Sequence, residues 1–254
     1  GGTLFNAGAI MTVHLEDLFY NGLSVADRLG TNHDVMSRVV LVVDEHEQFM
    51  VNMLYNMALL RAIKGDTVLM LLMKSSLEWI LDHHRFPENC RPSEDDKSRI
   101  HLRTFSSLND FDAMAVNPSL MTCHPSIVLV DDISFVQSFS DSSSAKSSLS
   151  RSIGFLLDAA DSVNPLPDVV ILLTMPLSST APISEHGHNF MHRLVRDQLI
   201  VTKTGDLYSL ATDALQNEAQ STRGARDCIF AVKDDMRVVL LEVITGPSRP
   251  PSVY

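Results

Sequence analysis

The sequence predicts an α/β protein built on a mostly parallel β-sheet, with helices on both faces and an antiparallel hairpin near the C-terminus. Three observations predict this fold class. Short runs rich in valine, isoleucine and leucine alternate with segments of helical periodicity, as in βαβ units. The apolar runs are nearly unbroken, which is typical of strands buried on both faces of a sheet. Late in the chain, two such runs flank Asp234-Asp235-Met236, which is a hairpin signal.

The first half of the chain alternates strands and helices. In residues 47–63, apolar side chains recur at spacings of three and four, which predicts an amphipathic helix ended by Lys64-Gly65-Asp66. Residues 87–99 are polar and charged, so we expect a surface loop there. The other expected elements are strands at 38–44, 67–73 and 100–105 and short helices at 77–84 and 110–115.

The second half continues the alternation. Serine-rich residues 138–150 are too polar for the core and are expected to form a mobile loop. Residues 149–163 predict an amphipathic helix, with Ile153, Leu156, Leu157 and Ala160 on one stripe. The remaining expected elements are strands at 125–134, 168–174, 198–203, 228–233 and 237–244, and a loop at 175–192 that ends in helix.

The length is sufficient for one large α/β domain or for two small ones, and we expect one domain over residues 14–245 with flexible ends at 1–13 and 246–254. No apolar run is long enough for a membrane helix, so we expect no membrane partner. The formal net charge is −11, which disfavours non-specific binding to nucleic acid because that binding needs Lys and Arg. The three cysteines are far apart in the sequence and indicate free thiols in a reducing compartment.

The most informative segment runs from Pro125 to Ser134, where an apolar strand leads into Asp131 and Asp132. Acids at the carboxyl end of a parallel strand lie where α/β folds bind ligands. In phosphate-loop NTPases, an Asp in this position holds the magnesium ion. No Gly-x-x-x-x-Gly-Lys-Ser/Thr motif accompanies it anywhere in the chain.

After the first predicted strand, residues 44–51 read Asp-Glu-His-Glu-Gln-Phe-Met-Val. A phosphate cradle needs inward-facing backbone N–H groups, which glycine permits, and a cation that reaches the terminal phosphates. Asp44, Glu45 and Glu47 would instead face the negative charges of a triphosphate. The sequence therefore argues against ordinary nucleotide binding at this turn, and we expect no ATPase activity and no catalytic residue in this chain.

This order of elements resembles the RecA-type core of the eukaryotic recombinase family. The serine-rich segment is similar in position to the first DNA-facing loop of that family, and residues 175–192 to the second. Residues 149–161 (Leu-Ser-Arg-Ser-Ile-Gly-Phe-Leu-Leu-Asp-Ala-Ala-Asp) resemble the helix after the Walker B strand. Residues 229–236 (Ile-Phe-Ala-Val-Lys-Asp-Asp-Met) resemble the family's C-terminal strand and turn.

The resemblance implies a RecA-like subunit without a working ATP site. In the favoured reading it is a recombinase paralogue, or a subunit associated with one, that heterodimerises with an ATP-binding paralogue. The pair would remodel or stabilise recombinase filaments on single-stranded DNA in the nucleus. ATP and magnesium would then belong to the partner, with no cofactor in this chain. The alternative is a RecA-like accessory subunit of the Elongator tRNA-modification complex.

Several roles remain open for Asp131 and Asp132. The first is to bind magnesium, and the second is to form part of a subunit interface. The third is to cap the strand by accepting hydrogen bonds from backbone amides. Because nucleotide sites in RecA-type assemblies lie between neighbouring subunits, we favour the partner interface, with the pair also bonded to Ser or Arg donors. A less favoured interpretation is that the Asp pair and residues 44–47 together form the acidic cluster of a metal hydrolase.

Other candidate residues lie outside this strand. Arg193, Arg196 and Lys203 add local positive charge that would face a phosphate backbone, or else form a solvated surface. Phe5, Ala7 and Ala9 loosely resemble the Phe-x-x-Ala tag by which recombinase protomers dock on a neighbour. His186, His188 and His192 have metal-like spacing, but a polar loop is the expected explanation, and no metal site is predicted.

Overall fold

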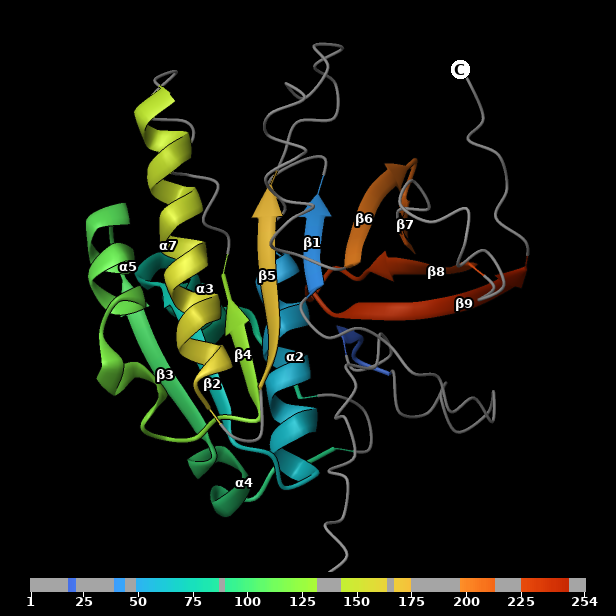
Figure 1. Ribbon diagram of the computed structural model, residues 1–254. Coiled ribbons are helices and arrows are strands. Elements are labelled where there is room, and N and C mark those ends of the chain that lie inside the picture. The colour runs from blue at the N-terminus through green and yellow to red at the C-terminus, as the bar shows by residue number, and fades with distance from the viewer. Residues whose placement is uncertain are drawn as a thin grey trace, which may run out of the picture.

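The computed structural model describes residues 18–21, 39–43, 49–86, 90–131, 143–163, 167–174, 197–212 and 225–246 (Figure 1). In these residues the strands are β1 (Val39–Val43), β2 (Val68–Met73), β3 (Ile100–Phe105), β4 (Ile127–Val130), β5 (Asp168–Thr174), β6 (Asp197–Thr204), β7 (Leu207–Thr212), β8 (Ala225–Val232) and β9 (Val238–Gly246). The helices are α2 (Phe49–Ile63), α3 (Lys74–His83), α4 (Glu94–Ser98), α5 (Leu108–Ala115) and α7 (Ser143–Asp161), with a 3₁₀ turn η2 (Pro118–Met121).

Nine strands form one sheet in the order β3-β2-β4-β5-β1-β6-β7-β8-β9. The neighbours from β3 to β6 are all parallel, and the neighbours from β6 to β9 are antiparallel. The predicted mostly parallel sheet is therefore confirmed. Its antiparallel part is larger than the predicted hairpin of β8 and β9, because β7 joins them to β6.

Helices cover both faces of the parallel strands, as predicted. In Figure 1, α5 and α7 lie in front of the sheet, and α2 and α3 lie behind it. Strand β2 shows how the faces divide: Val68, Met70 and Leu72 belong to the core beneath α2, whereas Leu69 and Leu71 belong to the core beneath α5 and α7. This alternation within an unbroken apolar run is what burial on both faces requires.

Helix α2 is buried almost all round rather than on one stripe, so the predicted amphipathic character is wrong. Apart from Tyr55 and Ile63, every residue of the helix is buried, including Asn52, Asn56 and Arg61. The helix contacts β2 and β3 on the sheet and also α3, α4 and β9. A helix enclosed in this way must satisfy its polar side chains inside the protein, because water does not reach them.

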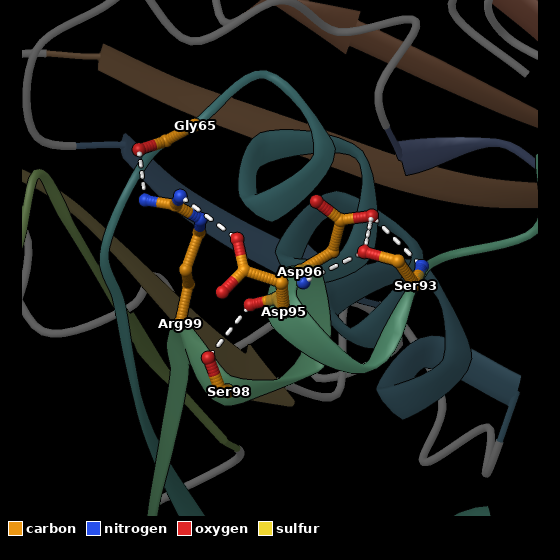
Figure 2. Close-up of polar contacts among 6 residues, drawn as sticks. All are labelled: Gly65, Ser93, Asp95, Asp96, Ser98 and Arg99. Carbon is orange, nitrogen blue, oxygen red and sulfur yellow. Dashed lines mark hydrogen bonds and ion pairs between the residues drawn. The ribbon is translucent and has the colours of Figure 1, made fainter.

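Residues 87–99 were expected to form only a loop, but they contain the short helix α4. Figure 2 shows the contacts that start it: Ser93 Oγ accepts from the amide of Asp96 at 3.1 Å, and the Asp96 carboxylate accepts from the amide of Ser93 at 2.8 Å. This reciprocal pair is a capping box. Arg99 closes the other end, donating to Gly65 O at 3.2 Å and to the Asp95 carboxylate at 3.3 Å.

The serine-rich segment also differs from the prediction. Helix α7 begins at Ser143, so the second half of residues 138–150 is helical rather than loop. The predicted apolar stripe of α7 is confirmed, since Ile153, Leu156 and Ala160 are fully buried and Leu157 is nearly so. Burial of that stripe against the sheet supports the helix, whereas serine only weakly opposes it.

Strand β7 was not predicted. It follows β6 through the two residues Gly205 and Asp206, and Gly205 has φ +63°. That conformation favours glycine in a tight hairpin turn. The proposed domain limits of 14 and 245 remain predictions, although β9 ends at Gly246, next to the second of them. Among the described residues, no helix is both long and apolar enough to cross a membrane.

Candidate functional site

The candidate site lies at the carboxyl edge of the parallel strands. Strand β4 ends at Val130, which pairs with Leu71 of β2 on one side and Ile171 of β5 on the other. Strand β5 separates β4 from β1, so these two strands lie about 10 Å apart, two strand spacings across the sheet. Residues 44–48, which follow β1 in the sequence, and Asp132 lie outside the described residues.

Asp131 is 2 % exposed and tied to the neighbouring strand. Its amide donates to Leu71 O at 2.9 Å, and its Oδ2 accepts from the amide of Met73, also at 2.9 Å. Met73 is the residue that precedes α3, and its own side chain makes no capping hydrogen bond. A carboxylate at a helix start is favourable because it faces free N–H groups and the positive end of the helix dipole.

This geometry corresponds to one of the roles that the sequence left open for the Asp pair. The Asp131 carboxylate accepts a hydrogen bond from a main-chain amide, and this bond joins β4 to the junction of β2 and α3. A residue this deeply buried within its own chain offers little surface to a second subunit. Any contact of the pair with a partner therefore falls to Asp132.

The first turn of α2 follows the acidic turn and is packed inside the chain. Phe49, Met50 and Val51 are 1 %, 2 % and 5 % exposed. The Phe49 ring lies edge-on to Tyr208 of β7, with 4.9 Å between ring centroids, and 6.2 Å from Phe230 of β8. Hydrophobic contact with the antiparallel strands thus fixes the start of this helix.

The other candidate residues are only partly placed. Lys203 is exposed near the end of β6, with Nζ 5.4 Å from the centroid of the Tyr208 ring. Arg193, Arg196 and the three histidines at 186, 188 and 192 lie outside the described residues, as do Phe5, Ala7 and Ala9. Within the described ranges, no group of three or more His, Cys, Asp or Glu side chains is arranged to hold a metal ion.

A buried ionic cluster lies at the amino ends of the strands, and the sequence reasoning missed it. Arg61 Nε lies 2.6 Å from Asp66 Oδ2, and Arg61 Nη2 lies 3.4 Å from Asp168 Oδ2. Burial raises the pKa of Asp168 to about 6, and the nearby Arg61 cation only partly offsets this effect. An arginine within an apolar helical run, and an aspartate opening a buried strand, were the available signals.

A second buried polar group joins α2 to α3. His84 Nε2 lies 3.0 Å from Asn56 Oδ1, and the His84 ring stands edge-on to Tyr55. Burial, and to a lesser extent the neighbouring Arg85 cation, together lower the pKa of His84 to about 4. The imidazole is therefore neutral at pH 7, and its Nε2–H donates to Asn56.

A hollow of about 290 Å³ lies between α5 and α7, apart from the Asp131 site. Its lining is mostly apolar and is formed by Asp112, Ala113, Val116, Arg151, Ser152 and Phe155. The Ser152 hydroxyl donates to the Asp112 carboxylate, which joins the two helices at one side of the hollow.

Comparison with known proteins supports the fold. No protein-family model and no curated protein matches the sequence. Among solved structures, the chain is similar to a KaiC-like protein from the hyperthermophilic archaeon Pyrococcus horikoshii OT3, with TM-score 0.53 and 10 % identity over 81 % of this chain and 89 % of that one. It is also similar to a RadB recombinase, with TM-score 0.52 and 16 % identity over 86 % of this chain and 97 % of that one. These likenesses confirm the RecA-like α/β fold.

Proposed function

We propose that this chain is a non-catalytic RecA-like subunit that heterodimerises with an ATP-binding recombinase paralogue. The pair remodels or stabilises recombinase filaments on single-stranded DNA during homologous recombination, and it acts in the nucleus. The observation that carries the proposal is the turn after β1, which contains Asp44, Glu45 and Glu47 and no glycine or lysine. ATP and magnesium are bound by the partner.

The three carboxylates after β1 would repel the negative charges of a triphosphate. At an effective dielectric constant of about 20, two like charges ~4 Å apart repel by roughly 4 kcal/mol. Three carboxylates beside a triphosphate therefore oppose its binding by more than a few backbone N–H groups return. Without a lysine in the turn, no cation there offsets this repulsion.

The surroundings of the turn support the same conclusion. The side chains of Phe49, Met50 and Val51 pack within the chain rather than facing a ligand. Asp131 bonds the Met73 amide, so its carboxylate stabilises the chain's own fold. In this proposal, the carboxyl edge of the parallel strands binds no nucleotide in this chain. It instead supports the fold and contacts the partner, with Asp132 as the contact residue.

The net charge of the chain affects how the subunit binds DNA. With a net charge of −11, the chain gains little from a phosphate backbone by itself. Local positive charge comes from Arg193, Arg196 and Lys203. In our proposal, these side chains approach single-stranded DNA that the partner already binds.

Two measurements test this function. The purified chain is titrated with ATP and magnesium by calorimetry and assayed for phosphate release, and we expect neither binding nor turnover. The tagged chain is then recovered from cells, and we expect an ATP-binding recombinase paralogue to co-purify. Binding of ATP that depends on residues 44–50 would overturn the proposal. So would recovery of two other RecA-like subunits with a tRNA acetyltransferase, the Elongator outcome.

Variants of the Asp pair sharpen the second measurement. Asp132→Ala is expected to reduce recovery of the partner, because this residue makes the proposed contact. Asp131→Asn is the matched control, since it removes a charge at the same strand end while keeping an oxygen that accepts from Met73. Equal recovery with both variants would contradict an interface role for Asp132.

A further inference from the structure

Residues 18–21 (Leu-Phe-Tyr-Asn), called the strap below, lie along the outer edge of β9. In Figure 1 the strap is the short blue segment below β9. The Tyr20 amide donates to Val238 O at 2.8 Å. Asn21 Nδ2 donates to Leu240 O at 2.9 Å, and Asn21 Oδ1 accepts from the Leu240 amide at 2.8 Å. The Asn21 side chain thus bonds Leu240 as a peptide group of a neighbouring strand would.

Two apolar side chains anchor the strap in the core. Leu18 is 1 % exposed and Phe19 is fully buried, with the Phe19 ring 5.3 Å from that of Phe230. Arg237 lies over the Tyr20 ring at 4.9 Å, and Asn56 Nδ2 lies 3.5 Å from Leu18 O. Because these anchors hold the strap independently of Asn21, the hydrogen bonds to Leu240 are a separate feature that one substitution removes.

Strand β9 has the composition of a self-pairing strand. Residues 238–244 read Val-Val-Leu-Leu-Glu-Val-Ile, with high β-propensity, one charge, and neither proline nor glycine. This strand is the last in the sheet order of the described residues, and Leu241 and Ile244 are 50 % and 44 % exposed. A long apolar edge strand with open N–H and C=O groups is a template for pairing with another chain.

We propose that the strap is an edge guard: by occupying the main-chain groups of Val238 and Leu240, it prevents β9 from pairing with β9 of a second copy of this chain. A second copy is the expected occupant because an antiparallel β9–β9 pair is self-complementary about a two-fold axis. Within residues 238–244, Glu242 is the one charged side chain that would disfavour this pairing. This inference is independent of the proposed nucleotide and DNA roles.

Asn21→Ala is the direct test. It removes both hydrogen bonds to Leu240 and leaves the buried anchors in place. We expect faster hydrogen exchange of the Leu240 amide in dilute protein, and concentration-dependent dimers by light scattering and sedimentation. Asn109→Ala, on the exposed side of α5, is the matched control and should behave as wild type. Adding Leu241→Lys to Asn21→Ala places a charge on the strand and should restore the monomer.

One criterion decides the inference: dimers must accompany loss of protection at Leu240. A folded Asn21→Ala protein that loses this protection and stays monomeric at every concentration overturns the edge guard. Unchanged protection at Leu240 also overturns it, because Asn21 would then not be what closes the edge. If Asn21→Ala fails to fold, Asn21→Leu is judged by the same criterion, since its side chain is similar in size to asparagine and can neither accept from the Leu240 amide nor donate to the Leu240 carbonyl.

Discussion

Asp131 shows how one side chain can serve the fold at the carboxyl end of a parallel strand, where α/β folds in general bind ligands. Its carboxylate accepts from the amide of Met73, a residue 58 positions away in sequence, at the start of α3. An acceptor is needed there because helix starts leave N–H groups unpaired and Met73 supplies no side-chain cap. The hydrogen bond from the Met73 amide therefore gives the acid at the end of β4 a role in the fold of its own chain.

Replacing this acceptor should cost stability. Asp131→Ala leaves the half-buried Met73 amide without this partner, and we expect the free energy of unfolding to fall by about 2 kcal/mol. Asp131→Asn keeps an accepting oxygen and should cost clearly less. Urea denaturation of the two variants and the wild type measures the difference. Equal losses in both variants would show that the charge, rather than the hydrogen bond, matters at this position.

At the scale of elements, α2 and α4 depart from their predictions for opposite reasons. Helix α2 has the spacing of an amphipathic helix, yet it contacts α3 and α4 as well as strands of the sheet, and all its residues except Tyr55 and Ile63 are buried. Helix α4 has almost no apolar residues, so periodicity could not indicate it. Its signal was the sequence Ser93-Glu94-Asp95-Asp96, a serine followed three residues later by an acid that closes a capping box.

The capping box gives a prediction for α4. Ser93→Ala removes the hydroxyl that accepts from the Asp96 amide and should destabilise the start of the helix by about 1 kcal/mol. Hydrogen exchange at Asp96 and Lys97 should accelerate while the sheet amides remain protected. Ser98→Ala is the control, because the Ser98 hydroxyl donates to Asp95 O in the last turn and takes no part in the capping box at the helix start. Similar exchange in both variants would argue against the capping role.

At the scale of the whole molecule, two buried groups give opposite dependences of stability on pH. The pKa of Asp168 is about 6 in the folded chain against an ordinary value of 3.8, so between these values the folded state holds a proton that the unfolded state has released. Stability from this group therefore falls as pH rises through that window. The pKa of His84 is about 4 against 6.5, so its contribution rises with pH between those values.

Single variants should separate the two effects. Relative to wild type, Asp168→Asn should gain about 2 kcal/mol of stability as pH rises from 4 to 6 and change little above that. His84→Gln, which keeps an N–H for Asn56, should lose relative stability as pH rises through the window from 4 to 6.5. Urea denaturation at a series of pH values measures both differences. A pH-independent difference for either variant would contradict its assignment.

The sheet itself was largely predictable, and the candidate site only in part. The strands at 67–73 and 168–174 were located within a residue because their apolar runs depend on neighbouring residues alone. Strand β7 was not predicted because its residues form no unbroken apolar run and show only a short alternation of apolar and polar side chains. The Asp131 position was identified from sequence, but its hydrogen-bond partner was not.

The sequence by itself determined the parallel core, the C-terminal hairpin, and an acidic turn after β1 without glycine or lysine. The tertiary structure decided which polar groups meet. Asp131 bonds an amide 58 residues away, Arg61 pairs with an aspartate 107 residues away, and Asn21 closes the edge of a strand 219 residues away. The physical reason is that periodicity records the spacing of near neighbours, whereas buried polar groups take whichever partner the closed fold brings within reach.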